Sequence, residues 1–179
     1  ALVLLAPTAA FLGTPLVTLL PAFARETYHL DPRGYSMMMA FWGSGAVIGA
    51  LHVAFQGNAP HKGYRSLLMQ IGLGVTLIAF AVSSNLWVAC VVLLFSGWAI
   101  LGVFALVNSL VQLQATDEMR GRIMSVYNTA FRGAMPLGNL LAGALATRFG
   151  SPLTISVNGV LLILVALVYI ARKDQVTRL

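Results

Sequence analysis

Residues 151–171 read SPLTISVNGVLLILVALVYIA and contain no charged side chain. An α-helix needs about 20 apolar residues to cross a hydrocarbon layer about 30 Å thick. Residues 159–171 do not alternate between apolar and polar side chains, as the strands of a membrane barrel do. Because a helix satisfies its own backbone hydrogen bonds in lipid, this stretch predicts a transmembrane α-helix.

The rest of the chain has the same character. Only 9% of its 179 residues are charged, whereas a soluble domain carries about 25%. One cysteine and three scattered histidines indicate neither a disulfide framework nor a metal site. The charges divide the chain into six predicted spans: 1–24, 34–55, 66–83, 86–113, 123–147 and 151–171. The sequence therefore predicts an all-α membrane protein, a single bundle of six transmembrane helices without a cofactor or metal.

The connecting segments differ in their content of Lys and Arg. Seven basic residues fall on one side of the predicted membrane: Lys62, Arg65, Arg120, Arg122, Arg172, Lys173 and Arg178. Three fall on the other side: Arg25, Arg33 and Arg148. Because cytoplasmic loops are enriched in Lys and Arg, the N-terminal edge and the C-terminus are expected in the cytoplasm. The net charge of +6 is then a topology signal, and no nucleic-acid partner is expected.

A short pattern recurs in the second and fifth spans, AFWG at 40–43 and AFRG at 130–133. Three helices followed by three similar helices must run with opposite topology, because three is odd, and inverted repeats of this kind are typical of transporters. Chance recurrence of small and aromatic residues remains the alternative. The small residues at Gly45 and Gly49, and at Gly138 and Ala142, are spaced four apart and predict close helix packing.

The loop at 114–127, QATDEMRGRIMSVY, is the most specific stretch. It resembles a loop of the major facilitator superfamily, in the branch containing the enterobactin exporter. Residues 136–138 (PLG) and 140–143 (LLAG) extend that resemblance. It implies helices seven to twelve of a twelve-helix transporter in the bacterial cytoplasmic (inner) membrane. The chain begins in apolar sequence without a Met, which fits a piece of a longer protein.

The resemblance also implies a function. Proteins of this kind export small amphiphilic molecules, such as drugs, siderophores or metabolites, by rocking two halves about a central cavity. The expected partners are a small-molecule substrate, the lipid bilayer, a proton as coupling ion and a missing N-terminal six-helix half. The loop at 58–65, NAPHKGYR, lies where the superfamily's Gly-rich basic motif would recur, but it lacks that motif's Asp.

Arg132 is the only charged residue inside a predicted span. A charge near the centre of a span costs about 2.5–3.5 kcal/mol on insertion scales, and such residues usually face a cavity or a partner. Arg132 is therefore a candidate to hold an anionic or hydrogen-bonding substrate, or to pair with a carboxylate of the missing half. Alternatively, the span begins late and the long side chain reaches the interface.

Polar amides within spans are the next candidates, because amides in lipid need protein partners or a cavity. Cavity lining and helix-to-helix bonding both remain open for them. The predicted cavity residues, with two aromatic candidates added, are Arg132, Asn108, Gln112, Asn139, Phe41 and Phe104. The predicted gate or kink residues are Pro15, which lacks a backbone N–H, and the loop charges Asp117, Arg120 and Arg122.

The positions of the acidic residues bear on proton coupling. Glu26, Asp31, Asp117, Glu118 and Asp174 all lie outside the predicted spans. Because a proton-coupled pump needs a titratable group in the membrane, that carboxylate is expected in the missing half. An enzyme is not expected, because the spans hold no HExxH motif, paired carboxylates or Ser/His set. A standalone six-helix membrane scaffold or assembly protein is the remaining alternative.

Overall fold

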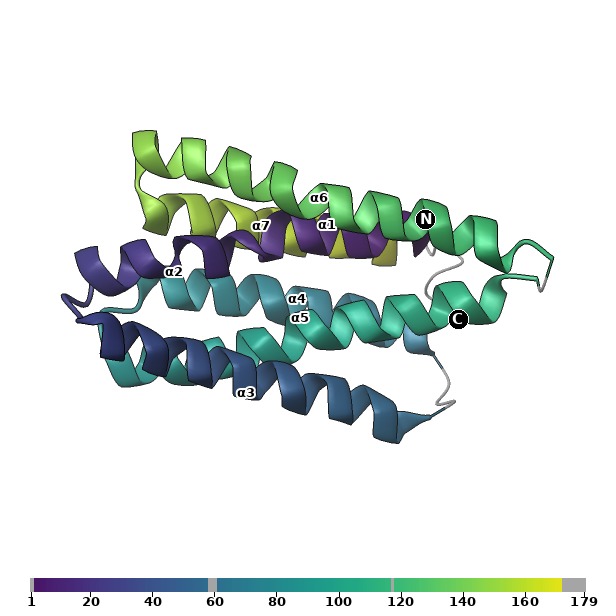
Figure 1. The fold of residues 1–179 in the computed structure, drawn as a ribbon, viewed down its shortest axis with the longest axis horizontal. Coiled ribbons are helices and arrows are strands. Elements are labelled where there is room, and N and C mark those ends of the chain that lie inside the picture. The colour runs from purple at the N-terminus through teal and green to yellow at the C-terminus, as the bar shows by residue number, and fades with distance from the viewer. Residues whose placement is uncertain (1, 58–60, 117, 172–179) are drawn as a thin grey trace.

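The computed structural model describes residues 2–57, 61–116 and 118–171 (Figure 1). The described residues form helices and contain no β-strand. The helices are α1 (Leu2–Gly13), α2 (Pro15–Glu26), α3 (Pro32–Gln56), α4 (Lys62–Val82), α5 (Leu86–Gln114), α6 (Arg120–Phe149) and α7 (Ser151–Ala171). The prediction of an all-α membrane fold is confirmed.

Local sequence explains where two of the long helices begin. The side chain of Asp31 accepts the N–H of Gly34 at 2.9 Å at the start of α3. Asn85 does the same for α5, because its Oδ1 accepts from Trp87 N at 2.9 Å and from Val88 N at 3.4 Å. The first N–H groups of a helix have no partner within it, so these side chains fix both starting points.

The first predicted span consists of two helices rather than one. Helix α1 ends at Gly13 and α2 begins at Pro15, with Thr14 between them. Proline has no N–H to donate, and its ring displaces the carbonyl four residues earlier. At the same place Val17 N donates to Thr14 O at 3.1 Å, which is a tighter turn than that of an α-helix. The break therefore lies inside the span, away from both of its ends.

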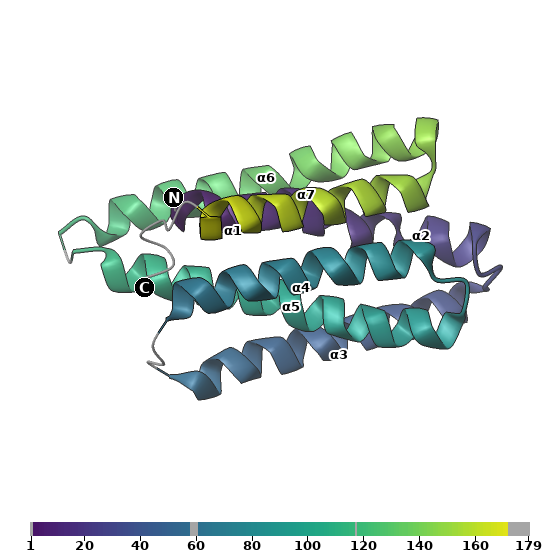
Figure 2. The same cartoon turned by 180° about the vertical axis from the view of Figure 1, so that it is seen from behind.

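Three of the helix pairs are related as they would be in an inverted repeat. Helix α3 packs along α5, α1 packs along α6, and α4 packs along α7 (Figures 1 and 2). The first three spans are α1 with α2, then α3, then α4, and the last three are α5, α6 and α7. Exchanging the two sets turns the α3–α5 pair into the α6–α1 pair. The same exchange leaves the α4–α7 pair unchanged. The α3–α5 and α1–α6 pairs each run in the same direction along the bundle (Figure 1).

Glycines allow these pairs to approach closely. An added Cβ at Gly45 or Gly49 of α3 would overlap the backbone carbonyls of Leu94 and Trp98 on α5. Gly138 of α6 meets the backbone of α1 in the same manner. Small residues spaced four apart thus mark the helix contacts, as the pattern predicts.

Within the described residues, five segments are long and apolar enough to cross a membrane: Leu4–Glu26, Pro32–Gln56, Lys62–Val82, Leu86–Gln114 and Ser151–Ala171. Helix α6 runs alongside them (Figure 2), but it is the least apolar of the helices. Its 30 residues include Arg132, Pro136 and Asn139. Helix α6 is therefore the one whose sequence is least suited to face lipid on every side.

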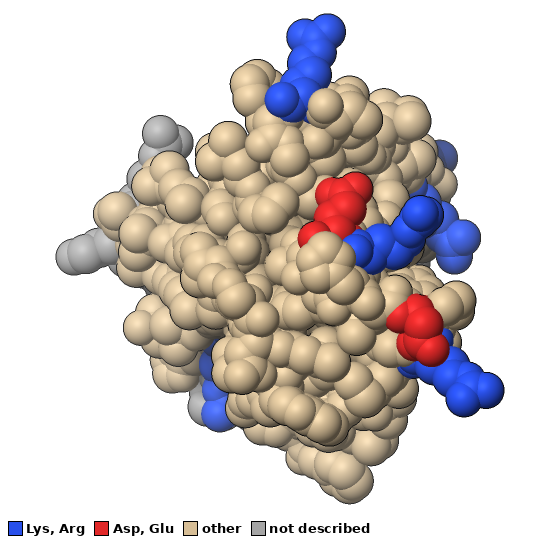
Figure 3. Space-filling model, turned by 90° about the vertical axis from the view of Figure 1, so that its left-hand side faces the viewer, with Lys and Arg blue, Asp and Glu red and all other residues tan. Residues whose placement is uncertain are grey.

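The described charges, apart from Arg132, lie at the two ends of the bundle. One end, called the basic end below, carries Lys62, Arg65, Glu118, Arg120 and Arg122. The opposite end carries Arg25, Glu26, Asp31, Arg33 and Arg148. Figure 3 looks onto this opposite end and shows a few charged side chains on a mainly uncharged surface.

Candidate functional site

A groove of about 420 Å³ lies between α5 and α6, and the broken first span forms its floor. The floor consists of Thr14 at the break and two residues of α2 after it, one wall belongs to α3 and α5, and the other wall belongs to α6. The lining residues are Thr14, Val17, Thr18, Trp42, Ile100, Leu101, Phe104, Phe131, Met135 and Asn139. Two of the predicted cavity residues, Phe104 and Asn139, therefore share one groove.

Thr14 connects the helix break to the far wall of the groove. Its hydroxyl lies 2.7 Å from the Ala10 carbonyl and 3.2 Å from Oδ1 of Asn139. A hydroxyl has one hydrogen to donate. If the Asn139 amide is turned over, its NH₂ donates to Thr14 while Thr14 donates to Ala10, and both bonds form. Asn139 therefore both lines the groove and links α6 to the break.

Aromatic rings form the part of the groove where α5 approaches α6. The rings of Phe104 and Phe131 meet edge to face, with centroids 4.7 Å apart and planes at 86°. Phe131 also stacks on Tyr127, with centroids 6.0 Å apart and planes at 11°. Tyr127 is buried, whereas Phe104 and Phe131 are half-buried. Both phenylalanines therefore present ring surface to the groove.

A second hollow, of about 530 Å³, continues along α5 toward the basic end. It is lined by Ala105, Asn108, Ser109, Gln112, Leu113 and Arg120. Gln112 Nε2 donates to Asn108 Oδ1 at 2.8 Å, so these predicted residues bond to each other across one helical turn. The buried Lys62 donates to Ser109 Oγ at 3.3 Å. The groove is thus apolar and aromatic at one level and polar at the next.

Arg132 is not among the residues that line the groove, but the helix periodicity places it on the same side of α6 as two residues that do. Residues three and seven positions apart share a helix face, so Arg132 lines up with Met135 and Asn139, both of which line the groove. It is about 18 Å along the axis from Arg120 and about 26 Å from Phe149, at 1.5 Å per residue. Its side chain is exposed and has no hydrogen-bond or ion-pair partner within the described part of the chain.

The other predicted residues lie elsewhere. Phe41 packs against the hydrophobic core, and its neighbour Trp42 lines the groove instead. Arg122 is exposed in the first turn of α6. Pro15 is buried at the break, directly beside Thr14. The predicted gate residue Asp117 lies outside the described residues.

Several lining residues could not be selected from the sequence. Thr14, Thr18, Leu101 and Met135 resemble ordinary residues of membrane helices, and their place in the groove depends on how the helices pack. A partial signal existed at Thr14, because a Gly–Thr–Pro sequence within a span predicts irregular backbone.

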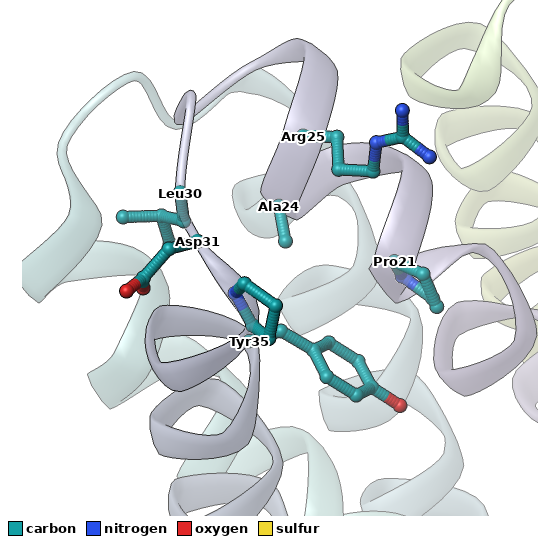
Figure 4. A pocket seen from close by; sticks show the side chains of 7 residues that line it. Pro21, Ala24, Arg25, Leu30, Asp31 and Tyr35 are labelled. Carbon is teal, nitrogen blue, oxygen red and sulfur yellow. The ribbon is translucent and has the colours of Figure 1, made fainter.

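A separate hollow of about 360 Å³ lies at the end opposite the basic end, between the end of α2 and the start of α3. Figure 4 shows Arg25 and Asp31 pointing to opposite sides of it, with the Tyr35 ring between α3 and Pro21. The Asp31 carboxylate is already engaged with the N–H of Gly34. This hollow is built from the connection between two helices and does not reach the aromatic pair.

Comparison with known proteins adds the family. The sequence profile of the transmembrane secretion effectors, a group within the major facilitator superfamily, matches residues 1–177. The chain belongs to this family. The transmembrane secretion effector family consists of membrane transport proteins. The groove is therefore part of a membrane transport protein.

Two relatives of this transmembrane secretion effector are Macrolide efflux protein A of Streptococcus pyogenes and the same protein of S. pyogenes serotype M6. Each is 24% identical over 170 residues, which are 94% of this chain. The matched region is 42% of the length of either relative. The chain therefore spans less than half the length of these efflux proteins.

Proposed function

We propose that this transmembrane secretion effector forms the C-terminal six-helix half of a secondary transporter, which exports small amphiphilic molecules by alternating access. The observation that carries the proposal is the groove between α5 and α6. It lies partway along the helices, and its lining includes three aromatic side chains and the Asn139 amide. Arg132, on the same side of α6 as Asn139, has no partner among the described residues. Such polar groups in a membrane helix usually face a pathway or a partner.

The helix pairing and the family support the same proposal. An inverted arrangement of three and three helices is the repeat on which many transporters are built, and the α3–α5, α1–α6 and α4–α7 pairs fit it. A second six-helix bundle, absent from this chain, would cover the open side of the groove. The two relatives, which this chain matches over 42% of their length, are efflux proteins by name.

The proposed orientation follows from charge. The basic end lies in the cytoplasm, because Lys and Arg are retained on that side of the bacterial inner membrane. Both the N-terminal edge and the end of α7 are at that end (Figure 1). The polar hollow next to Asn108 and Gln112 then opens toward the cytoplasm, from which an exporter takes its substrate.

A proton is the proposed coupling ion, and its carboxylate is proposed to lie in the other half. The described acids are Glu26 and Asp31 at one end of the bundle and Glu118 at the other. None of these three is at the depth of the aromatic pair. The described residues therefore offer no carboxylate to carry a proton through this half of the transporter.

Filling the groove tests the proposal. In the full-length protein, Thr18→Trp places a large ring on the exposed floor of the groove. Export of compounds from a chemically diverse panel should fall about tenfold or more, because the substrate loses its space. Val160→Trp is the matched control, since Val160 is 47% exposed on α7, away from the groove.

Accumulation of each compound in cells, with and without a collapsed proton gradient, is the measurement. Equal export by Thr18→Trp and Val160→Trp, at equal protein levels, would remove the groove from the transport path. If full-length protein exports nothing from the panel, the scaffold alternative is favoured.

A further inference from the structure

The charge distribution around the groove points to the chemical class of ligand. This inference rests on the proposed function, because it concerns the substrate of the same groove. Arg132 follows Phe131 in α6 and shares a helix face with the groove residues Met135 and Asn139, while the described carboxylates are at the helix ends. Glu26 is the acid nearest along the floor, eight residues or about 12 Å beyond Thr18.

Arg132 has the geometry of a recognition residue. It is exposed, it has no partner in the described part of the chain, and it follows Phe131 directly. A guanidinium offers five N–H donors in a planar fork and cannot lose its charge. That fixed charge attracts anions and repels cations over several ångströms.

The phenylalanine pair supplies the apolar part of the site. Phe104 and Phe131 are half-buried and hold each other edge to face at 4.7 Å. Aromatic rings pack favourably with further rings in offset or edge-to-face arrangements. A flat aromatic body can therefore rest against this pair while its polar group extends toward Arg132 on the adjoining side of α6.

We propose that this groove selects aromatic amphiphiles that carry a negative charge or a strong hydrogen-bond acceptor, with Arg132 recognising that group. Cationic amphiphiles of the same shape are disfavoured, because Arg132 would have to be desolvated beside another positive charge. The polar hollow at Asn108 and Gln112 adds amide groups but no described carboxylate that would attract a cation.

Two dyes with a shared xanthene body and opposite charge test the inference. Fluorescein is an anion at neutral pH and rhodamine 123 is a cation. Equilibrium binding to the purified full-length protein is followed by fluorescence anisotropy. Fluorescein should bind about tenfold more tightly, because one hydrogen bond to a charged group has about that effect.

Substitutions assign the preference to its residue. Arg132→Gln should weaken fluorescein binding about tenfold and leave rhodamine 123 unchanged or tighter. Arg132→Lys keeps the charge and should retain the preference for fluorescein. Arg148→Gln makes the same change at the far end of α6 and should leave both affinities unaltered. Phe104→Leu should weaken both dyes equally, because both carry the same rings.

The outcomes separate this inference from the proposed function. Tighter binding of rhodamine 123, equal binding of both dyes or binding of neither would overturn the inference. Equal weakening of both dyes by Arg132→Gln would also overturn it, by showing that Arg132 does not discriminate between ligands by their charge. The exporter proposal would survive each of these results if panel compounds were still exported, and it would fall only if they were not.

Discussion

The α4–α7 interface and the α5–α6 groove differ in how closely their two helices pack. At the first, Gly74 and Gly159 face each other, and a Cβ on either would lie 2.6 Å from the other's carbonyl oxygen. The surrounding Leu73, Leu77 and Leu162 are fully buried. At the second, α5 and α6 meet through one aromatic pair and leave a groove beside it. Tight apolar packing stabilises the bundle, whereas the looser contact through one aromatic pair leaves room for a ligand.

The largest effect is expected at the tight interface. Gly74→Ala should lower the free energy of unfolding by about 1–3 kcal/mol, because the added methyl group forces α4 and α7 apart. Gly72→Ala is the control, since a Cβ there meets nothing within 4 Å. Thermal unfolding of the purified protein in detergent compares the two. Similar melting temperatures would mean that α4 and α7 are not held by close glycine contact.

The next effect is expected at the floor of the groove. Thr14→Val removes the hydroxyl that lies 3.2 Å from Asn139 and should cost about 1 kcal/mol of stability. Export should also fall by more than the loss of stability alone explains, because the lost bond connects the helix break to the wall of the groove. Thr76→Val is a matched control, since the Thr76 hydroxyl bonds only to Leu73 within its own helix. Unaltered export by Thr14→Val would separate the break from transport.

The smallest effect is expected outside the membrane. The Tyr28 hydroxyl donates to the Ser83 carbonyl at 2.7 Å, and burial raises the pKa of Tyr28 above its ordinary 10.0. The neutral phenol is favoured in the folded protein. Its contribution is therefore complete below pH 10 and is lost as the pH rises through the raised pKa.

Tyr28→Phe tests this contribution. The variant should lose less than about 1 kcal/mol of stability at neutral pH, where the hydrogen bond is removed. As the pH rises from 10 through the raised pKa of Tyr28, its melting temperature should approach that of the unchanged protein, because the unchanged protein then loses the bond as well. A constant difference across that pH range would show that ionisation of Tyr28 does not contribute.

Much of the fold follows from where charges and small residues fall. The uncharged run at 151–171 is α7, and the glycine steps at Gly45 and Gly138 lie at helix contacts. These features can be recognised locally, because the length of an apolar run and the size of a side chain do not depend on how the helices pack. The division of the first span at Thr14 lies beside Pro15, the predicted kink residue, whereas Pro7 and Pro21 occur in the same span without breaking it.

The groove was accessible only in part. Phe104 and Asn139 could be chosen because aromatic and amide residues are conspicuous in lipid-facing sequence. Phe41 and Trp42 are adjacent and similar, and which of them lines the groove depends on the rotation of α3 against α5. That rotation is set by contacts between residues far apart in the chain, such as Gly97 with Trp42, and no local pattern encodes it.

Pro15 has one consequence for the neighbouring helix. Because proline has no N–H, the carbonyl of Phe11 lacks its usual donor four residues later. The backbone at Gly138 lies directly against that oxygen and shields it from hydrocarbon. Moving α6 away from α1 would leave an unsolvated dipole in the bilayer, which costs several kcal/mol. The broken span and α6 are therefore expected to move as one rigid body, and any change in the width of the groove is expected on its α3–α5 side.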